Sequence, residues 1–170
     1  MRYILILGLS FFAAASMASA PELFSGAEWI RDPVFTGVPV LNLFHREFES
    51  KPEISGPTHV HTLFRKEITL NSTPISATLF ITGDDYYKFY INGKYVVQGP
   101  SPSYHFAYPY YRLDVTNSLH AGTNCLAAHV YYQGLINRVW NSADNRSGFL
   151  LALELSYEDG ATECVITNTD

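Results

Sequence analysis

The sequence predicts an all-β fold in which two antiparallel sheets pack face to face as a β-sandwich. The first observation is a hairpin signal over residues 84–97, where two runs of aromatic and β-branched residues flank Asn92-Gly93. The second is that flanking segments also alternate between apolar and polar residues, and they outnumber the strands that one sheet would use. The third is an apolar face on the first hairpin arm that a second sheet must cover, made by Tyr87, Phe89 and Ile91.

The first twenty residues have the pattern of a signal peptide. Arg2 precedes an apolar run, and Ala18-Ser19-Ala20 is the small-x-small pattern of a signal-peptidase site. A transmembrane anchor is the alternative, but the run is short for the roughly 20 apolar residues that a spanning helix needs. We therefore expect cleavage of residues 1–20, a secreted or periplasmic location without membrane attachment, and one β-sandwich domain over residues 21–170.

The remaining elements follow from where alternating runs begin and end. Trp29 lies in an otherwise polar entry segment and is expected to anchor the N-terminus against the sandwich. Residues 117–122 are expected to form a single helical turn ending at Gly122, and 133–147 a long polar loop. Strands are expected at 41–48, 63–68, 76–82, the two hairpin arms, 112–116, 123–132, 149–157 and 163–167.

The charge balance excludes nucleic acid as a partner. The chain has 11 Lys plus Arg against 16 Asp plus Glu, a net charge of −5, and loss of Arg2 with the signal peptide leaves −6. Nucleic-acid binding needs grouped Lys and Arg to neutralise phosphates, and no such group occurs. Aromatic residues make up 15% of the chain, with 12 Tyr, which suits a β domain that uses Tyr for surface contacts.

Two cysteines, Cys125 and Cys164, lie in strand-like runs of a chain that is expected to be exported. A disulfide between them is permitted there and would stabilise the fold by about 4 kcal/mol through loop closure. The alternative is a pair of small buried thiols. Their spacing is not that of a metal-binding cysteine cluster.

A series of short motifs resembles the N-terminal domain of bacterial α-L-rhamnosidases. In order, the motifs are Ala27-Glu28-Trp29-Ile30, Leu63-Phe64-Arg65-Lys66-Glu67, Ala77-Thr78-Leu79-Phe80-Ile81, Tyr90-Ile91-Asn92-Gly93-Lys94, Leu113-Asp114-Val115-Thr116 and Glu158-Asp159-Gly160. The resemblance implies a jelly-roll β-sandwich similar to galactose-binding and carbohydrate-binding modules. It also implies catalytic and other β domains of a larger enzyme as partners, so the chain is expected to be either the N-terminal part of that enzyme or a free-standing module.

No constellation in the sequence predicts catalysis by this chain alone. Asp84 and Asp85 are neighbours on a strand, so we expect their carboxylates on opposite faces. Glycoside hydrolysis instead needs two carboxyl groups about 5 to 10 Å apart across a cleft. His59 and His61 share a face and could reach one metal ion, but no third ligand lies nearby in sequence.

The long loop after Tyr132 is the predicted ligand site, because loops of more than about 12 residues in compact domains are usually functional. It combines an indole, amides, guanidinium groups and a carboxylate, which are the groups that a sugar site uses. An ordered loop with an internal pair of Arg138 and Asp144 is the alternative. The predicted ligand-binding residues are Asn137, Arg138, Trp140, Asp144 and Asn145, with Tyr132 and Tyr110 widening the platform.

The resemblance also supplies the expected ligand and function. It implies L-rhamnose or rhamnosides as the carbohydrate, and calcium as a cofactor that Asp144 would ligate through oxygen. The leading hypothesis is a secreted, non-catalytic carbohydrate-binding or accessory domain that supports degradation of rhamnose-containing glycans. The alternative is a purely structural scaffold that packs on a glycoside hydrolase catalytic domain and has no ligand of its own.

Overall fold

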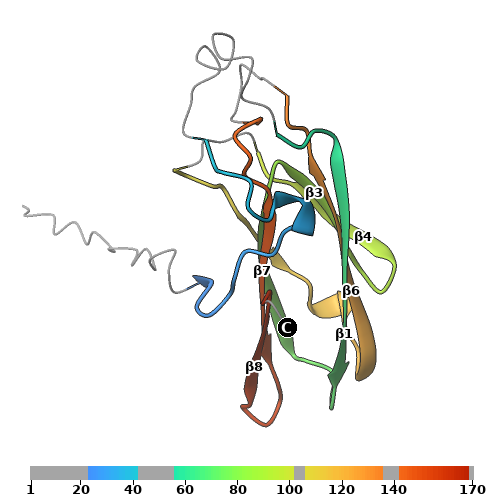
Figure 1. The fold of residues 1–170 in the computed structure, drawn as a ribbon. Helices are drawn as coiled ribbons and strands as arrows, with labels where there is room; N and C mark the ends of the chain where they lie inside the picture. The colour runs from blue at the N-terminus through green and yellow to red at the C-terminus, as the bar shows by residue number, and fades with distance from the viewer. Residues whose placement is uncertain (1–22, 42–55, 102–105, 136–141, 169–170) are drawn as a thin grey trace, which may run out of the picture.

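The computed structural model describes residues 23–41, 56–101, 106–135 and 142–168, and these residues form a two-layer β-sandwich (Figure 1). The strands are β1 (Val60–Leu70), β2 (Ser76–Asp84), β3 (Tyr86–Ile91), β4 (Lys94–Gly99), β5 (Tyr111–Asp114), β6 (Gly122–Tyr132), β7 (Gly148–Ser156) and β8 (Thr162–Ile166). One sheet has the order β1-β6-β3-β4 and the other β5-β2-β7-β8. All strand pairs are antiparallel, so the predicted fold class is confirmed.

The hairpin of β3 and β4 has the predicted turn. Asn92 and Gly93 have φ values of 51° and 75°, and two successive positive φ angles are what a type I′ turn requires. The pairing shifts by one residue after Phe89, where β4 has a bulge. The apolar face of β3 is buried as expected, with Tyr87, Phe89 and Ile91 no more than 2% exposed.

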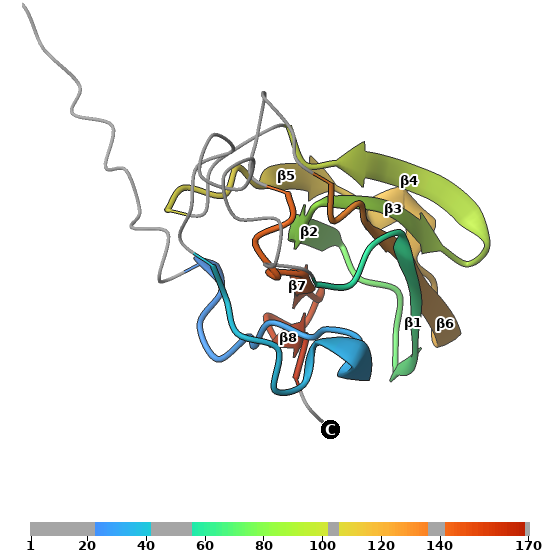
Figure 2. The same cartoon turned by 45° about the horizontal axis from the view of Figure 1, so that its top comes forward.

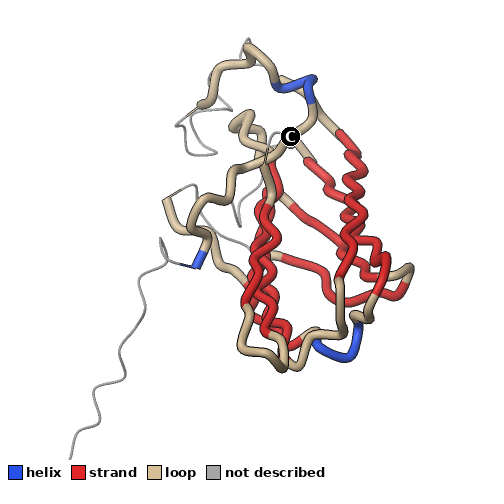
Figure 3. The backbone as a smooth tube through the Cα atoms, turned by 90° about the horizontal axis from the view of Figure 1, so that it is seen from below, coloured by secondary structure: helices blue, strands red, loops and turns tan. Residues whose placement is uncertain are grey.

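The hydrophobic core lies between the two sheets, which Figure 3 shows as two layers of strands. Alternation along β6 directs Leu126, Ala128 and Val130 inward, as the sequence predicted. Leu79 on β2 and Leu153 on β7 meet them from the other sheet, and both are completely buried. The predicted helical turn is also present as η2 (Thr116–Ser118), and Gly122 after it has a φ of 91°.

The N-terminal segment crosses the side of the sandwich where edge strands β1 and β8 lie (Figure 2). Ile30 and Phe149 exchange two backbone hydrogen bonds, at 2.8 and 3.1 Å. Asp32 accepts a hydrogen bond from the Thr62 hydroxyl on β1 at 3.1 Å, and its other oxygen caps η1 (Pro33–Phe35). The segment therefore connects both sheets.

Trp29 packs on the start of β7, as an anchor of this segment would, but it is not the most buried aromatic residue of the segment. The buried aromatic residue is Phe35, which is 0% exposed and meets the ring of Tyr132 edge to face at 5.0 Å. Trp29 remains 42% exposed. An exposed indole on an ordered segment is available for a ligand, because its large apolar surface is not used by the core.

The cysteines are not bridged. Cys125 lies between the buried residues Asn124 and Leu126, so alternation directs its sulfur to the outer face of its sheet, where it accepts from Arg65 Nε at 3.3 Å. Cys164 is exposed on β8, in the other sheet. Of the two alternatives that the sequence left open, the disulfide is not formed, because the thiols point away from the space between the sheets, and Cys164 is not a buried thiol either.

Two predicted segments fall outside the described residues, namely the signal peptide at 1–20 and the strand at 41–48 beyond Leu41. In the part of the chain that the structure does describe, no helix has the length and apolar character needed to span a membrane.

Candidate functional site

A pocket of about 400 Å³ opens at the end of the sandwich where β2 passes into β3. Its residues come from four separate parts of the sequence and include two rings, two guanidinium groups and a carboxylate. The lining consists of Trp29, Arg31, Val40, Asp84, Tyr108, Arg146 and Ser147, and we call it the Trp29 pocket. Its size lies within the range of about 300 to 1,000 Å³ that is usual for small-molecule sites.

The aromatic wall of the pocket is made by Trp29 and Tyr108. Their ring centroids are 5.2 Å apart and the planes are inclined by 56°. Trp29 lies over the start of β7, where a Cβ at Gly148 would be 2.8 Å from the indole. The missing side chain of Gly148 is therefore what allows the indole to approach the strand this closely.

The polar floor of the pocket begins with Asp84, which accepts a hydrogen bond from the Tyr108 hydroxyl at 2.8 Å. Asp84 ends β2 in one sheet, and β3 in the other sheet begins at Tyr86. Asp84 and Asp85 are both buried, at 7% and 6% exposure. Because the chain changes sheets here, the expectation of carboxylates on opposite strand faces is wrong, and each lies close enough to affect the ionisation of the other.

Asp85 ties the pocket floor to the long loop. Its Oδ2 accepts from the Ser142 hydroxyl at 2.6 Å and from the backbone N–H of Gln133 at 2.7 Å. Its Oδ1 is buried and has no hydrogen-bond partner in the described part of the chain. Burial raises the pKa of Asp85, and these two hydrogen bonds act against that rise.

Burial also raises the pKa of Asp84, in this case well above its ordinary value, and the charge of Asp85 adds to the effect. Tyr108 has a raised pKa for the same reasons, first burial and then the charge of Asp84. The hydroxyl therefore stays a hydrogen-bond donor throughout the physiological range. The floor of the pocket is therefore the shielded carboxyl group of Asp84, and the buried carboxyl group of Asp85 follows it in the chain.

The cationic side of the pocket is held by an ion pair. Arg146 Nη1 lies 2.8 Å from Asp144 Oδ2 and also donates to the carbonyl of Leu41 at 2.8 Å. Asp144 is 1% exposed. Burial raises the pKa of its carboxyl group, while the hydrogen bonds and the charge of Arg146 lower it. Since the carboxylate is shielded, the pair fixes the guanidinium at the pocket wall.

Three of the predicted site residues that the structure describes lie inside the fold and not at its surface. Asp144 and Asn145 are 1% and 2% exposed, and Tyr132 is 1% exposed, so the expectation that they face solvent is wrong. Asn145 instead holds the loop, because its N–H donates to the Tyr132 hydroxyl at 2.9 Å and its Nδ2 to the carbonyl of Pro39 at 3.0 Å. These hydrogen bonds replace water for groups that the fold has buried.

The ring of Tyr110 packs against Phe24 at 5.8 Å and Phe80 at 6.3 Å, and Tyr110 does not line the Trp29 pocket. Three other predicted residues, Asn137, Arg138 and Trp140, lie outside the described residues. The residues that sequence reasoning missed are Trp29, Arg31, Asp84, Tyr108 and Arg146. The usable signal was Trp29 itself, a large aromatic residue within a polar segment.

The predicted calcium ligand does not fit the environment of Asp144. One of its oxygens accepts from the Arg146 backbone N–H at 3.0 Å and the other from the guanidinium. A calcium ion needs six to eight oxygen ligands and would have to displace that cation. Among the residues that the structure describes, no three His, Cys, Asp or Glu side chains are placed to hold a metal ion.

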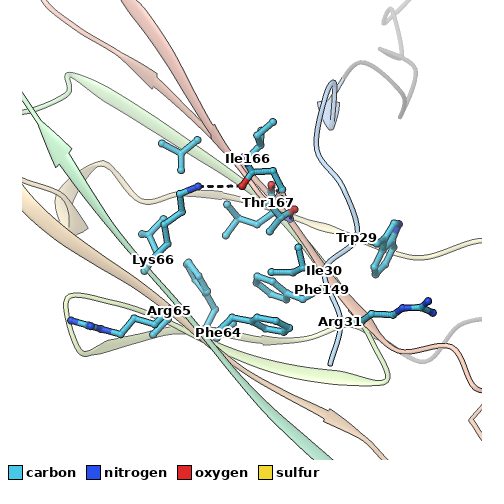
Figure 4. A pocket seen from close by; sticks show the side chains of 16 residues that line it. Trp29, Ile30, Arg31, Phe64, Arg65, Lys66, Phe149, Ile166 and Thr167 are labelled. Carbon is cyan, nitrogen blue, oxygen red and sulfur yellow. Dashed lines mark hydrogen bonds between the residues drawn. The ribbon is translucent and has the colours of Figure 1, made fainter. Parts of the chain in front are cut away.

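A second, more apolar groove of about 550 Å³ shares Trp29 and Arg31 with the Trp29 pocket. Phe64 and Phe149 stack in its centre with centroids 6.1 Å apart, and Arg31 and Arg65 extend outward from it (Figure 4). The groove lies between edge strand β1 and the end of β8, so it enters the space between the two sheets. Its lining resembles an uncovered part of the core more than a sugar site.

The buried acids predict a pH dependence of stability. Because the folded pKa of Asp84 lies above its unfolded value of about 3.9, the native state binds more protons in the interval between them. The contribution of Asp84 to the stability of the fold is therefore fully present below the unfolded pKa and is lost as pH rises through the folded pKa. We expect Asp84→Asn to raise the melting temperature at pH 7 by a few degrees, since the amide can still accept from Tyr108.

Thermal unfolding of both proteins from pH 4 to pH 8 measures this effect. Glu158→Gln, which removes an exposed acid, is the matched control and is expected to leave the curve unchanged. A lower melting temperature of Asp84→Asn at pH 7, or an undiminished pH slope, would show that the Asp84 carboxylate stabilises the fold.

Comparison with known proteins finds similarity in sequence and in fold. A family model for the alpha-L-rhamnosidase N-terminal domain matches residues 72–170. A curated alpha-L-rhamnosidase from Formosa agariphila is 39% identical over 67 residues, which cover 37% of this chain and 7% of the relative. The region that the family model matches includes the whole β3–β4 hairpin and the strands β5 to β8.

Two solved structures have the same fold over a similar region. A GH78 family rhamnosidase of Bacillus sp. GL1 is 27% identical with a TM-score of 0.54, over 66% of this chain and 11% of that chain. The alpha-L-rhamnosidase of Streptomyces avermitilis, complexed with L-rhamnose, is 21% identical with a TM-score of 0.50, over 84% of this chain and 13% of that chain. The chain thus spans only a small part of the length of these enzymes.

Proposed function

Because the chain belongs to the alpha-L-rhamnosidase N-terminal domain family, we propose that it is a non-catalytic carbohydrate-binding domain that holds a rhamnoside unit in the Trp29 pocket. The observation that carries the proposal is an exposed indole beside a shielded carboxyl group. Trp29 is 42% exposed, and Tyr108 links the aromatic wall to Asp84. The signal-peptide pattern of residues 1–20 supports export of this domain to where polymeric glycans are found.

The pocket chemistry matches a deoxy sugar such as rhamnose. The C–H groups of the sugar pack on the indole of Trp29, and the methyl group lies on the apolar part of the wall at Val40. Arg31 and Arg146 donate to ring hydroxyls, and Asp84 accepts from a hydroxyl. The hydrogen bonds fix orientation while the ring supplies contact area.

Titration of L-rhamnose into the chain, followed by NMR, tests the proposal. We expect saturable binding near millimolar, which corresponds to about 4 kcal/mol, and at least a tenfold loss in Trp29→Ala. Tyr110→Ala is the matched control, because this ring is similarly exposed at 40% but lies outside the pocket. A chelator is expected to change nothing. Absence of binding by the folded wild type, or equal loss in both variants, would contradict the assignment.

The chain alone is proposed to have no hydrolytic activity. Asp84 and Asp85 are consecutive and buried, with the Tyr108 and Ser142 hydroxyls bound to them. Such an arrangement leaves no room for a glycosidic bond between two carboxyl groups. The purified chain is expected to release no aryl group from aryl α-L-rhamnosides, and activity that Asp84→Asn abolishes would contradict this.

A structural scaffold is the second candidate, and the apolar groove of Figure 4 favours it. The groove exposes part of the core beside Phe64 and Phe149, and a neighbouring domain of a larger rhamnosidase could cover it. A scaffold without a ligand predicts that rhamnose leaves the NMR spectrum unchanged. The rhamnose titration therefore separates the two candidates.

A further inference from the structure

The outer face of the sheet β1-β6-β3-β4 carries a row of rings that spans three strands. His61 on β1 is opposite Tyr131 on β6, and Tyr131 is opposite Tyr86 on β3. The ring of His61 stacks on that of Tyr131 at 4.5 Å, and Tyr86 stacks on Tyr131 at 6.3 Å, with planes inclined by less than 20°. The register of the sheet therefore aligns these rings side by side.

A polar row lies beside the rings on the same face. His129 on β6 is opposite Lys88 on β3, and Lys88 is opposite Gln98 on β4. The two rows are joined by a hydrogen bond of 2.9 Å between His61 Nδ1 and His129 Nε2. Three basic side chains, Lys88, His61 and His129, therefore gather on one patch of an acidic protein.

These side chains line a pocket of about 510 Å³ that is separate from the Trp29 pocket. Its polar lining includes His61, Tyr86, Lys88, Gln98, His129 and Tyr131, and no Asp or Glu is present among the described residues that line it. Lys88 is exposed and takes part in none of the ion pairs found within the described ranges. A basic pocket without a carboxylate is suited to an anion.

The charges around the histidine pair also favour an anion as the ligand. The pKa of His129 is lowered first by burial and then by the neighbouring His61 and Lys88. Tyr86 and Tyr131 flank the pair, and His59 contacts the Tyr131 hydroxyl at 2.9 Å. The pKa of Tyr86 is raised first by burial and then by the charge of Asp85, which is itself buried and does not line this pocket. A bound anion would supply the negative charge that favours a proton on His129.

We propose that this pocket, the Lys88 pocket, binds an acidic sugar unit of the uronic acid type. The carboxylate lies against Lys88 and His129, which donate charge-assisted hydrogen bonds to it. Gln98 and the tyrosine edge of the pocket hydrogen-bond to the ring hydroxyls. The carboxylate selects the ligand, because a neutral sugar would leave Lys88 without a counter-charge.

A divalent metal on the histidine pair is the competing occupant. Two ring nitrogens 2.9 Å apart could both turn to one ion, but only two imidazoles are present and Lys88 repels a cation. The pocket thus favours an anion over a metal ion, and the experiment below includes both.

NMR titration of the chain with D-galacturonate tests the proposal, with D-galactose as the matched neutral ligand. We expect saturable chemical-shift changes at Lys88 and His129 with galacturonate but not with galactose. Galacturonate should bind at least tenfold more tightly at pH 5.5 than at pH 7.5, and added NaCl should weaken its binding. Lys88→Gln and His129→Gln should each reduce affinity at least tenfold. Lys94→Gln, at the exposed hairpin turn, is the matched charge control and should bind as wild type.

Several outcomes would overturn the proposal. One is equal binding of galactose and galacturonate, and another is unchanged affinity in Lys88→Gln. Equal displacement by acetate would show that no sugar is recognised, and saturable Zn²⁺ binding at His61 and His129 without galacturonate binding would assign the pocket to a metal. Trp29→Ala should retain galacturonate binding, so failure of the rhamnose proposal and failure of this one are distinguishable.

Discussion

Replacing Phe149 by Ala is expected to lower the melting temperature by roughly 10 °C, because large-to-small changes of buried Phe cost about 3 to 5 kcal/mol. Phe149 is 3% exposed and its ring meets those of Phe64, Phe89 and Tyr87 at 6.1, 6.2 and 5.7 Å. All three partners lie on the sheet β1-β6-β3-β4, whereas Phe149 lies on β7 in the opposite sheet. The substitution therefore leaves a cavity where the layers meet, and it removes packing next to the backbone pair with Ile30.

Thermal unfolding measures the effect, and Leu63→Ala serves as the control because Leu63 is 78% exposed on β1. The control is expected to change the melting temperature by less than about 2 °C, since exposed substitutions usually change stability by about 0.5 kcal/mol or less. A similarly small change for Phe149→Ala would mean that the open groove tolerates the missing ring. Rhamnose binding by the folded variant should persist, because Phe149 does not line the Trp29 pocket.

The second large effect is expected for Asn124→Leu, which replaces a completely buried amide on β6. Asn124 Nδ2 donates to the carbonyls of His120 and Gly122 at 2.7 and 3.1 Å. Its Oδ1 accepts from Asn92 Nδ2 at 2.9 Å and from the N–H of His120 at 3.2 Å. The side chain thus joins the hairpin turn to the start of β6, and its loss leaves these groups unpaired in the interior.

We expect Asn124→Leu to lose about 3 kcal/mol of unfolding free energy, since each unsatisfied buried group costs about 1 to 3 kcal/mol. Urea denaturation with a constant m-value measures this loss. Asn117→Ala, an exposed amide in η2, is the control and should stay within about 0.5 kcal/mol of wild type. A loss below about 1 kcal/mol would indicate that water enters and satisfies the groups that Asn124 now pairs.

Local sequence patterns predicted the fold class and most of the strands. The hairpin, the inward residues of β3 and β6 and the turn at Gly122 were predicted correctly. These features depend on neighbouring residues, namely on alternation with a period of two and on the φ angles that Asn-Gly allows. Local patterns therefore sufficed to predict them.

Which polar residues face solvent and which pair in the interior depends on contacts between distant parts of the chain. The Trp29 pocket combines residues from four distant segments, and the burial of Asp144 depends on Arg146 and on the carbonyl of Leu41, more than 100 positions earlier in the chain. Asp84 and Asp85 came together because the chain changes sheets between β2 and β3, which alternation within one strand cannot represent. The site could therefore not be predicted from local sequence patterns, because long-range packing sets the desolvation and hydrogen bonding of each group.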